Sequence, residues 1–316
     1  MTTTLPQAAT ATSPGPGRRR LLPRTRAGRL PRSLRTGLLL APALLVVVVL
    51  FLGGLALGAL QSFGYQPFLP GWHWTLSSYT GLWHDPAVRA SLFLTLRVSV
   101  LATAVSATLA VACALLIRRT RRGRNLLTVL FQSTLPVPHV VGAVAMLLLL
   151  GQSGFLARLL HLVGLVGAPA SAPALVTDGF GWGILAEYVW KETPFIGVVV
   201  LAALSRGVDE LEDVGRVLGA SAWQRFRSIT LPLVAPAVLA GSVIVFAFAF
   251  GSYEVPYLLG RTYPATLPVV AYQRFTDSDL TARPEAMAIS MVVALVATVL
   301  VLAYVRLTES LLGRRS

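Results

Sequence analysis

Charged residues are scarce in this sequence. They make up 13% of its 316 residues, whereas 55% are hydrophobic and the mean hydropathy is +0.70. Such a chain has too little polar surface to cover a water-soluble globule, and several of its apolar runs reach the roughly 20 residues that a helix needs to cross a bilayer. The composition therefore excludes an ordinary soluble domain and predicts an all-α membrane protein with several spans.

Cysteine and histidine are also rare. Cys113 is the single cysteine, which excludes a disulfide within the chain. The four histidines are scattered without the spacing of metal ligands, and there is no Walker-type phosphate-binding loop. No arrangement of nucleophile and base indicates an enzyme. We therefore expect no catalytic residue, no metal site and no cofactor bound by this chain.

Negative charge is much rarer than positive charge, and the net charge is +14. A basic balance is typical of proteins that bind nucleic acid. Here, however, the arginines cluster beside apolar runs, where positive charge sets the orientation of a membrane protein. We expect membrane lipid, and no nucleic acid, as a partner. Residues 1–36 hold eight arginines and a stretch rich in Thr, Ala, Pro and Gly, which predicts a disordered basic arm before an uncleaved anchor.

Six apolar runs are long enough to cross a membrane as helices. They are Gly37–Leu60, Ala90–Ile117, Leu126–Leu150, Phe180–Leu204, Leu233–Ser252 and Pro284–Val305. The sequence thus predicts a first transmembrane helix over residues 37–60 and a core of five transmembrane helices over residues 90–305. The apolar stretch over residues 155–167 is too short to cross and is expected to lie at the surface or to re-enter.

Basic residues are distributed unevenly on the two sides of these runs. If the N-terminus is cytoplasmic, the inner segments hold 20 arginines and the outer segments hold five. Because cytoplasmic loops carry the excess of basic residues, both termini are predicted to be cytoplasmic.

One predicted cytoplasmic segment, residues 207–232, is amphipathic. Apolar residues recur at helical spacing on both sides of Gly219, and glycine commonly ends a helix with a sharp turn. The segment predicts two short helices joined at Gly219, the second of which ends at Leu231–Pro232. An interfacial helix that rests on lipid headgroups is the alternative. Four acidic residues precede the glycine, however, and acids are repelled by an anionic leaflet, so a protein partner is favoured.

The stretch "DVGRVLGASAWQRFRSITLP" resembles the EAA loop of binding-protein-dependent ABC importer permeases. That pattern has EAA, three residues, Gly, nine residues and then I-x-L-P. Here Asp213, Val214 and Gly215 occupy the EAA positions, Gly219 follows at the right spacing, and residues 229–232 read I-T-L-P. The departures are small, although Gly215 in place of alanine weakens a helix by about 1 kcal/mol.

This resemblance implies a fold and a set of partners. The fold is that of a type I ABC importer permease, and the loop at 207–232 couples to a cytoplasmic ABC ATPase dimer that binds ATP and Mg²⁺. The chain is then a transport subunit and no enzyme, and it lies in the inner membrane of a prokaryote. Its further partners are a second permease, identical or homologous, and an extracytoplasmic substrate-binding protein. The coupling residues implied are Glu212, Asp213, Val214, Gly215, Leu218, Gly219, Ala220, Ile229, Leu231 and Pro232.

Two further stretches bear on the substrate. "FGSYEVPYLLG" at residues 250–260 resembles permeases of the polyamine, sulfate, iron and thiamine branch, whereas "VWKETPF" at 189–195 resembles a segment of sugar permeases. We expect a polyamine, an inorganic or organic ion, or a thiamine-like solute, with a sugar or a glycerol-phosphate-like solute as the alternative. A secondary transporter or channel without an ATPase is the alternative of a different class.

Few charges fall inside the predicted spans. Glu187 and Lys191, at spacing i, i+4, either line the substrate path or pair with each other inside the helix bundle. Tyr253 and Glu254 follow the fifth predicted span and contact either substrate or binding protein, or are an ordinary interfacial aromatic and a solvated acid. The prolines of "LPVPHVVG" predict a kink in the third span, at residues 135–142.

Overall fold

The computed structural model describes residues 32–67, 69–205 and 207–313. Every regular element in this part of the chain is helical, which confirms the predicted all-α class. The chain divides into two compact units, residues 1–53 and residues 54–316. The predicted basic arm lies outside the described residues as far as residue 31, and helix α1 begins at Arg32, earlier than the predicted end of the arm.

The described part of the first unit is a helix that exposes apolar side chains all round. It contains α1 (Arg32–Val46) and a π-helical turn, η1 (Val47–Leu52), and every described side chain from residue 36 to residue 52 is exposed. A helix with this surface needs lipid around it. Together with α2 (Gly53–Ser62) it forms an apolar stretch, Thr36–Ser62, of membrane-spanning length, as predicted for residues 37–60.

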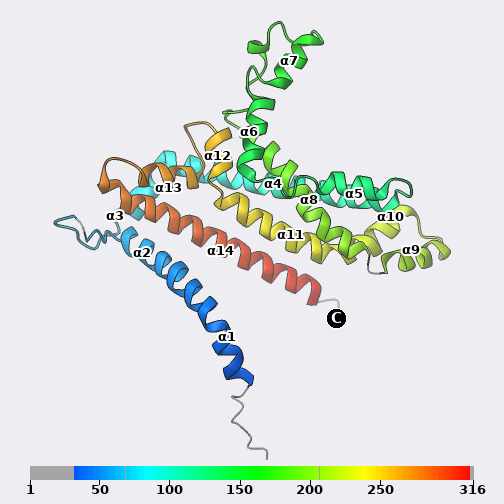
Figure 1. Ribbon diagram of the computed structural model, residues 1–316, viewed down its shortest axis with the longest axis horizontal. Coiled ribbons are helices and arrows are strands. Elements are labelled where there is room, and N and C mark those ends of the chain that lie inside the picture. Colours follow the sequence, from blue (N-terminus) through cyan, green and yellow to red (C-terminus); the bar gives the residue numbers. More distant parts are fainter. Residues whose placement is uncertain (1–31, 68, 206, 314–316) are drawn as a thin grey trace, which may run out of the picture. The chain divides into compact units, whose positions relative to one another are not determined.

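Long helices form the centre of the second unit. α4 (Pro86–Arg119) packs along α8 (Trp182–Leu204) and α11 (Leu231–Gly251), and α11 packs on α14 (Arg283–Gly313; Figure 1). On α4 small buried residues recur every four positions, at Ala102, Ser106, Ala110 and Ala114. Small side chains let helices approach closely in a membrane. This stripe explains why two other helices pack against α4.

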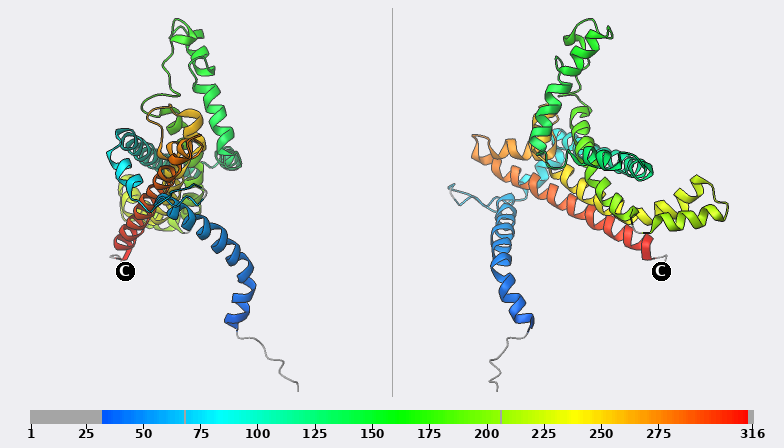
Figure 2. Two further views of the ribbon diagram at one scale, coloured as in Figure 1. Left: turned by 90° about the vertical axis from the view of Figure 1, so that its left-hand side faces the viewer. Right: turned by 45° about the vertical axis from the view of Figure 1, so that its right-hand side comes forward.

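Short helices lie at both ends of these long helices. One end carries α3 (Ser77–His84), α12 (Glu254–Leu259), α13 (Leu267–Phe275) and the 3₁₀ turn η4 (Leu280–Ala282). The other carries α9 (Val208–Val217) and α10 (Ala222–Arg225). Figure 1 and the right-hand view of Figure 2 show α9 and α10 together at one end of the long helices, beside the ends of α8 and α11. The amphipathic segment is thereby placed at one end of the helix bundle.

The third predicted span is wrong as a single helix. The chain forms α5 (Arg124–Gln132), leaves the helix at residues 133–138, and resumes as α6 (His139–Leu150). Pro136 and Pro138 have no N–H to donate, so two helical hydrogen bonds are missing within three residues and the helix is interrupted here. The apolar stretch of spanning length is instead His139–Leu162, which joins α6 to α7 (Phe155–Leu162) and takes in part of the run predicted not to cross. A 3₁₀ turn, η2 (Pro169–Ser171), follows.

Five stretches of the described chain are long and apolar enough to cross a membrane. They are Thr36–Ser62, Pro86–Arg119, His139–Leu162, Ala222–Gly251 and Leu280–Arg306. α8 has 23 residues, which is also sufficient length, but it carries Glu187, Lys191 and Glu192 in its middle. These charged residues distinguish α8 from the five apolar stretches.

Candidate functional site

The segment at residues 207–232 forms a helical hairpin. After α9, Gly219 adopts a left-handed backbone with φ of 81°. The N–H of Gly219 donates to the carbonyl of Arg216 at 3.0 Å, and the N–H of Ala220 donates to that of Gly215 at 2.9 Å. This pair of hydrogen bonds is the Schellman arrangement, in which glycine is favoured because it has no Cβ to strain. The predicted turn at Gly219 is confirmed.

A capping box starts the second arm of the hairpin. The hydroxyl of Ser221 accepts a hydrogen bond from the N–H of Gln224 at 3.2 Å, and the N–H of Ser221 donates to the Gln224 side chain at 2.7 Å. The two bonds satisfy N–H groups that have no partner at the start of a helix. The S-x-x-Q spacing is a sequence signal for a capping box. The prediction of two helices joined at Gly219 was made without this signal.

The second arm does not end at Leu231–Pro232 as predicted. α10 continues through a π-helical turn, η3 (Phe226–Thr230), directly into α11. The N–H of Leu231 donates to the carbonyl of Phe226, five residues earlier. A widened turn at this place accommodates Pro232, which has no N–H for the regular ladder. The second arm of the hairpin and α11 therefore form one continuous helix, the candidate span Ala222–Gly251.

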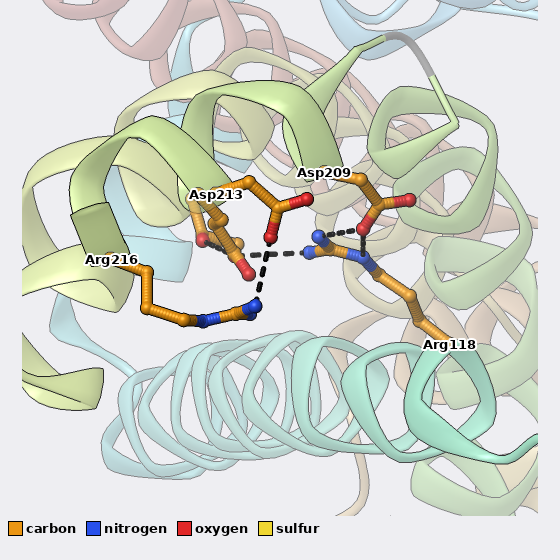
Figure 3. A network of polar contacts seen from close by, with 6 residues as sticks. Arg118, Asp209, Asp213 and Arg216 are labelled. Carbon is orange, nitrogen blue, oxygen red and sulfur yellow. Dashed lines mark hydrogen bonds and ion pairs between the residues drawn. The ribbon is translucent and has the colours of Figure 1, made fainter.

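Arg118, at the end of α4, binds two carboxylates of α9 (Figure 3). Its guanidinium donates to Asp209 and, at 3.1 Å, to Glu212, and its side chain is only 13% exposed. Glu212 also accepts a hydrogen bond from the hydroxyl of Thr230 in η3, which is buried. A chain of polar contacts thus joins α4, α9 and η3. No local pattern predicts it, because Arg118 lies 91 positions from Asp209.

Glu212 is held in its charged form. Burial alone would raise its pKa, but the hydrogen bonds from Thr230 and Arg118 and the positive charge of Arg118 outweigh burial and lower the pKa below that of an ordinary glutamate. The carboxylate is therefore ionised at any physiological pH, and the contacts between α4, α9 and η3 persist.

Gly215 allows α9 to lie close to η3. A Cβ at this position would be 3.0 Å from the Cδ1 of Ile229 and 3.4 Å from the side chain of Arg225. Contacts this close require the neighbouring side chain to shift. The glycine that departs from the EAA pattern therefore lowers the helix propensity of α9 and permits close packing of the hairpin arms.

One face of the hairpin exposes large apolar side chains. Val217 is 88% exposed, Leu218 80% and Trp223 66%, and Leu211 and Val214 are exposed beside them. Surface patches of this kind mark binding sites for other molecules. We call these five residues the apolar face.

The acidic residues before Gly219 interact mainly within the chain. Asp209 and Glu212 bind Arg118, and Asp213 pairs with Arg216 at 3.0 Å, where both side chains are 65% exposed (Figure 3). The inference of a protein partner therefore depends on the apolar face and no longer on these acids.

The acidic residues of α8 are buried against α6. Glu187 is fully buried, and its Oε1 lies 3.2 Å from Nδ1 of His139. Glu192 lies 3.5 Å from Nε2 of the same ring. A Cβ on Gly142 would be 2.9 Å from the Glu187 carboxylate, so glycine permits this contact between the helices. Within the described residues no group of three His, Cys, Asp or Glu side chains is placed to hold a metal ion.

Lys191 binds the interruption between α5 and α6. Its ammonium donates to the carbonyls of Thr134 at 2.7 Å and Leu135 at 3.2 Å. The carbonyl of Thr134 cannot be paired in an α-helix, because residue 138 is a proline without an N–H, and it accepts from the N–H of Val137 at 3.1 Å in addition to Lys191. Among the ion pairs of the described residues, none joins Glu187 to Lys191, so these two side chains bind separate parts of the neighbouring segment.

Tyr253 and Glu254, predicted near the outer end of the fifth span, lie at the start of α12. Tyr253 packs against Tyr257 and Tyr272, with ring centroids 5.0 and 4.5 Å away, and it lines a cavity of about 430 Å³ together with Tyr272. Burial, and then the neighbouring tyrosines, raise the pKa of Tyr253. Its hydroxyl is therefore neutral at physiological pH. Glu254 is exposed.

Comparison with known proteins shows which family has this architecture. The profile of a family described as "Binding-protein-dependent transport system inner membrane component" matches residues 104–314. The molybdenum transport system permease protein ModB of Mycobacterium tuberculosis is 29% identical over 223 residues, which are 69% of this chain and 78% of the relative. ModB of Escherichia coli K12 is 33% identical over 196 residues, which are 60% of this chain and 80% of the relative.

The fold also matches a solved transporter. A chain of a bacterial alginate ABC transporter, crystallised with a periplasmic protein carrying an alginate pentasaccharide, superposes with a TM-score of 0.73 at 20% identity, over 88% of this chain and 96% of the other. The family match spans the hairpin and the helices α8, α11 and α14 that surround it. The chain therefore belongs to the binding-protein-dependent transport system inner membrane components, and it is a multi-pass permease subunit of an ABC importer in the inner membrane.

Proposed function

We propose that the hairpin at residues 207–232 docks on a separate ATPase subunit and transmits its movement to the membrane helices. The observation that carries this proposal is the apolar face, which is exposed on a hairpin anchored to α4 through Arg118 and Glu212 and continuous with α11. Because these connections are direct, a displacement of the hairpin moves the ends of two long helices.

The proposed topology has six spans with both termini in the cytoplasm. α8 is the sixth span: it is long enough, and its charged side chains are buried against α6 and the interruption before it. Ionisable groups inside a membrane protein face the bundle interior in this way. The excess of arginines in the segments around the hairpin supports its cytoplasmic location.

The proposed assembly contains three further kinds of subunit. A dimer of ATPases binds ATP and Mg²⁺, so this chain needs no cofactor of its own. A second permease, identical or homologous, completes the membrane part. A binding protein delivers the solute from outside, and the alginate transporter is in complex with a periplasmic protein that carries an alginate pentasaccharide. The family description already implies such a protein.

The proposed substrate is an inorganic oxyanion such as molybdate. Two relatives are named as molybdenum transport permeases. A neutral tyrosine hydroxyl donates hydrogen bonds to anionic oxygens, and Tyr253 offers one at the cavity beside α12. Glu187 and Lys191 then stabilise the helices that line the substrate path. The sugar-permease-like stretch at residues 189–195 supports a sugar as the second candidate.

Docking is tested by adding charge to the apolar face. Replacement of Val217 and Leu218 together by aspartate should reduce copurification of the ATPase at least about tenfold, because buried apolar anchors dominate such interfaces. The matched control is Val163→Asp with Leu165→Asp, which changes the same residue types at exposed positions after α7. Equal copurification for both double variants would refute the docking proposal.

The substrate is tested on the assembled complex. Proteoliposomes that contain the permease, its ATPase and the copurifying binding protein should accumulate radiolabelled molybdate on addition of ATP. Accumulation of a disaccharide in place of molybdate would overturn the oxyanion proposal and leave the permease role intact.

A further inference from the structure

A basic cavity lies between the end of α4 and the hairpin. Its volume is about 480 Å³. The arginines in its lining are Arg118, Arg119, Arg121, Arg216 and Arg225, and the acids are Asp209 and Glu212. The lining therefore carries more positive than negative charge, which favours an anion in the cavity.

The two acids do not neutralise the whole lining. Both are bound by Arg118, and Arg216 pairs with Asp213 outside the cavity wall. Arg119 and Arg121 are exposed and have no hydrogen bond or ion pair with any described residue. Three arginines of the cavity thus remain without a carboxylate partner.

Arg225 gives a second indication of a missing partner. One of its terminal nitrogens donates to the carbonyl of Ala220 at 2.5 Å, whereas its Nε is buried and has no hydrogen-bond partner in the described part of the chain. Buried N–H groups in folded proteins are almost always paired. An anion with several oxygens would satisfy this group together with the free donors of Arg119 and Arg121.

The cavity lies where a membrane-spanning helix ends. Arg118 and Arg119 are the last residues of the apolar stretch Pro86–Arg119. At the end of such a helix hydrocarbon gives way to lipid headgroups, and arginines just beyond it attract anionic lipids. Arginine is also well suited to phosphate, because its planar donors bind two oxygens at once.

We propose that this cavity binds a phosphate group, supplied in the membrane by the headgroup of an anionic phospholipid. The bound group neutralises Arg119, Arg121 and Arg225 and fixes the distance between the end of α4 and the hairpin. The inference rests on the proposed function only in placing the hairpin at the cytoplasmic face. The binding itself requires no ATPase, so it is measured on the permease alone.

The test compares two double variants of the full chain in detergent. Arg119→Gln with Arg121→Gln removes two arginines of the cavity. Arg122→Gln with Arg124→Gln removes equal charge from the same connection but outside the cavity lining. Native mass spectrometry would count phosphatidylglycerol retained during titration, with phosphatidylcholine as the neutral lipid and inorganic phosphate as the free anion.

The cavity variant should bind phosphatidylglycerol more weakly than the wild type by about fivefold for each arginine lost. The control variant should bind as the wild type does. Saturable binding of inorganic phosphate without any preference for phosphatidylglycerol over phosphatidylcholine would confirm the anion site and assign it to a free anion. Equal weakening in both variants, or no binding of either probe, would overturn the proposal.

A third variant separates binding from folding. Arg119→Lys with Arg121→Lys keeps the charge and should retain most of the phosphatidylglycerol binding, and its thermal unfolding should match that of the glutamine variant. If the glutamine variant loses the ATPase while its lipid and phosphate binding stay unchanged, the cavity belongs to the subunit interface and the proposal is wrong.

Discussion

Gly219 is the residue on which the turn of the hairpin depends. A Cβ there would have open space around it, but its φ of 81° is unfavourable for any side chain. We expect Gly219→Ala to lower the free energy of unfolding by about 1–2 kcal/mol and to weaken ATPase association, because left-handed backbone strains an L-residue by that amount. Gly219→Asn should lose less, since asparagine tolerates this conformation. Thermal unfolding in detergent and copurification measure the two effects.

Gly81 provides the matched control for that strain. It also has open space where a Cβ would lie, but it sits inside α3 with ordinary helical backbone. Gly81→Ala should leave stability unchanged or raise it by up to about 1 kcal/mol. Equal destabilisation by the two alanine substitutions would contradict the assignment of backbone strain to Gly219.

Arg118 and Glu212 should make the hairpin sensitive to acid. The pKa of Glu212 is lowered from 4.5 in the folded chain, so its stabilising contribution is present above that pH and is lost as the pH falls through the lower folded-state value. We expect the unfolding temperature to fall with pH below about 4.5, and Arg118→Gln to lose about 1–2 kcal/mol at pH 7 and to flatten this dependence.

The exposed pair of Arg216 and Asp213 is the comparison for that effect. Both side chains are 65% exposed, so solvent screens their attraction. Arg216→Gln should change stability by no more than about 0.5 kcal/mol at pH 7 and leave the acid response intact. A flattened acid response in this variant would show that Glu212 is not the responsible group.

Local signals in the sequence explain which residues of the site were predictable. Gly219 is placed by spacing and by the chemistry of helix ends, and both act within a few residues. Arg118 and Thr230 are brought to Glu212 by the packing of three helices, and no short stretch contains that information. The role of Arg118 could therefore be found only in the structure.

The interruption between α5 and α6 is stabilised by one side chain, that of Lys191. Lys191 donates hydrogen bonds to the carbonyls of Thr134 and Leu135 in this interruption, and Thr134 also accepts from the N–H of Val137. Lys191→Met should therefore destabilise the protein by about 1–3 kcal/mol, because it removes two hydrogen bonds donated by a buried ammonium group. We expect transport to fall with stability. Lys191→Arg, which keeps donors and charge, should lose less in both measurements, whereas equal losses for the two variants would argue against these hydrogen bonds.

Helix positions were predictable where apolar length alone decides them. The first span and α4 agree with their predicted ranges within a few residues. The third did not, because hydropathy continues through Pro136 and Pro138 while the helical hydrogen bonds do not. The end of the hairpin was missed for the opposite reason: a π-helical turn carries the helix past Pro232. Proline alone does not distinguish these two outcomes.

The arrangement of the whole chain across the membrane is testable because Cys113 is its only cysteine. In a Cys113→Ser background, Trp223→Cys would place one thiol on the hairpin and Trp74→Cys one on the loop after α2, at positions that are 66% and 59% exposed. The proposed topology puts these on opposite sides. In intact cells a membrane-impermeant maleimide should label Cys only at position 74, and after permeabilisation it should label both. Labelling of the hairpin in intact cells would show that the orientation is the reverse of the proposed one. The apolar face would then lie outside the cell, where a cytoplasmic ATPase cannot bind it, and the arginine distribution would not predict the topology of this chain.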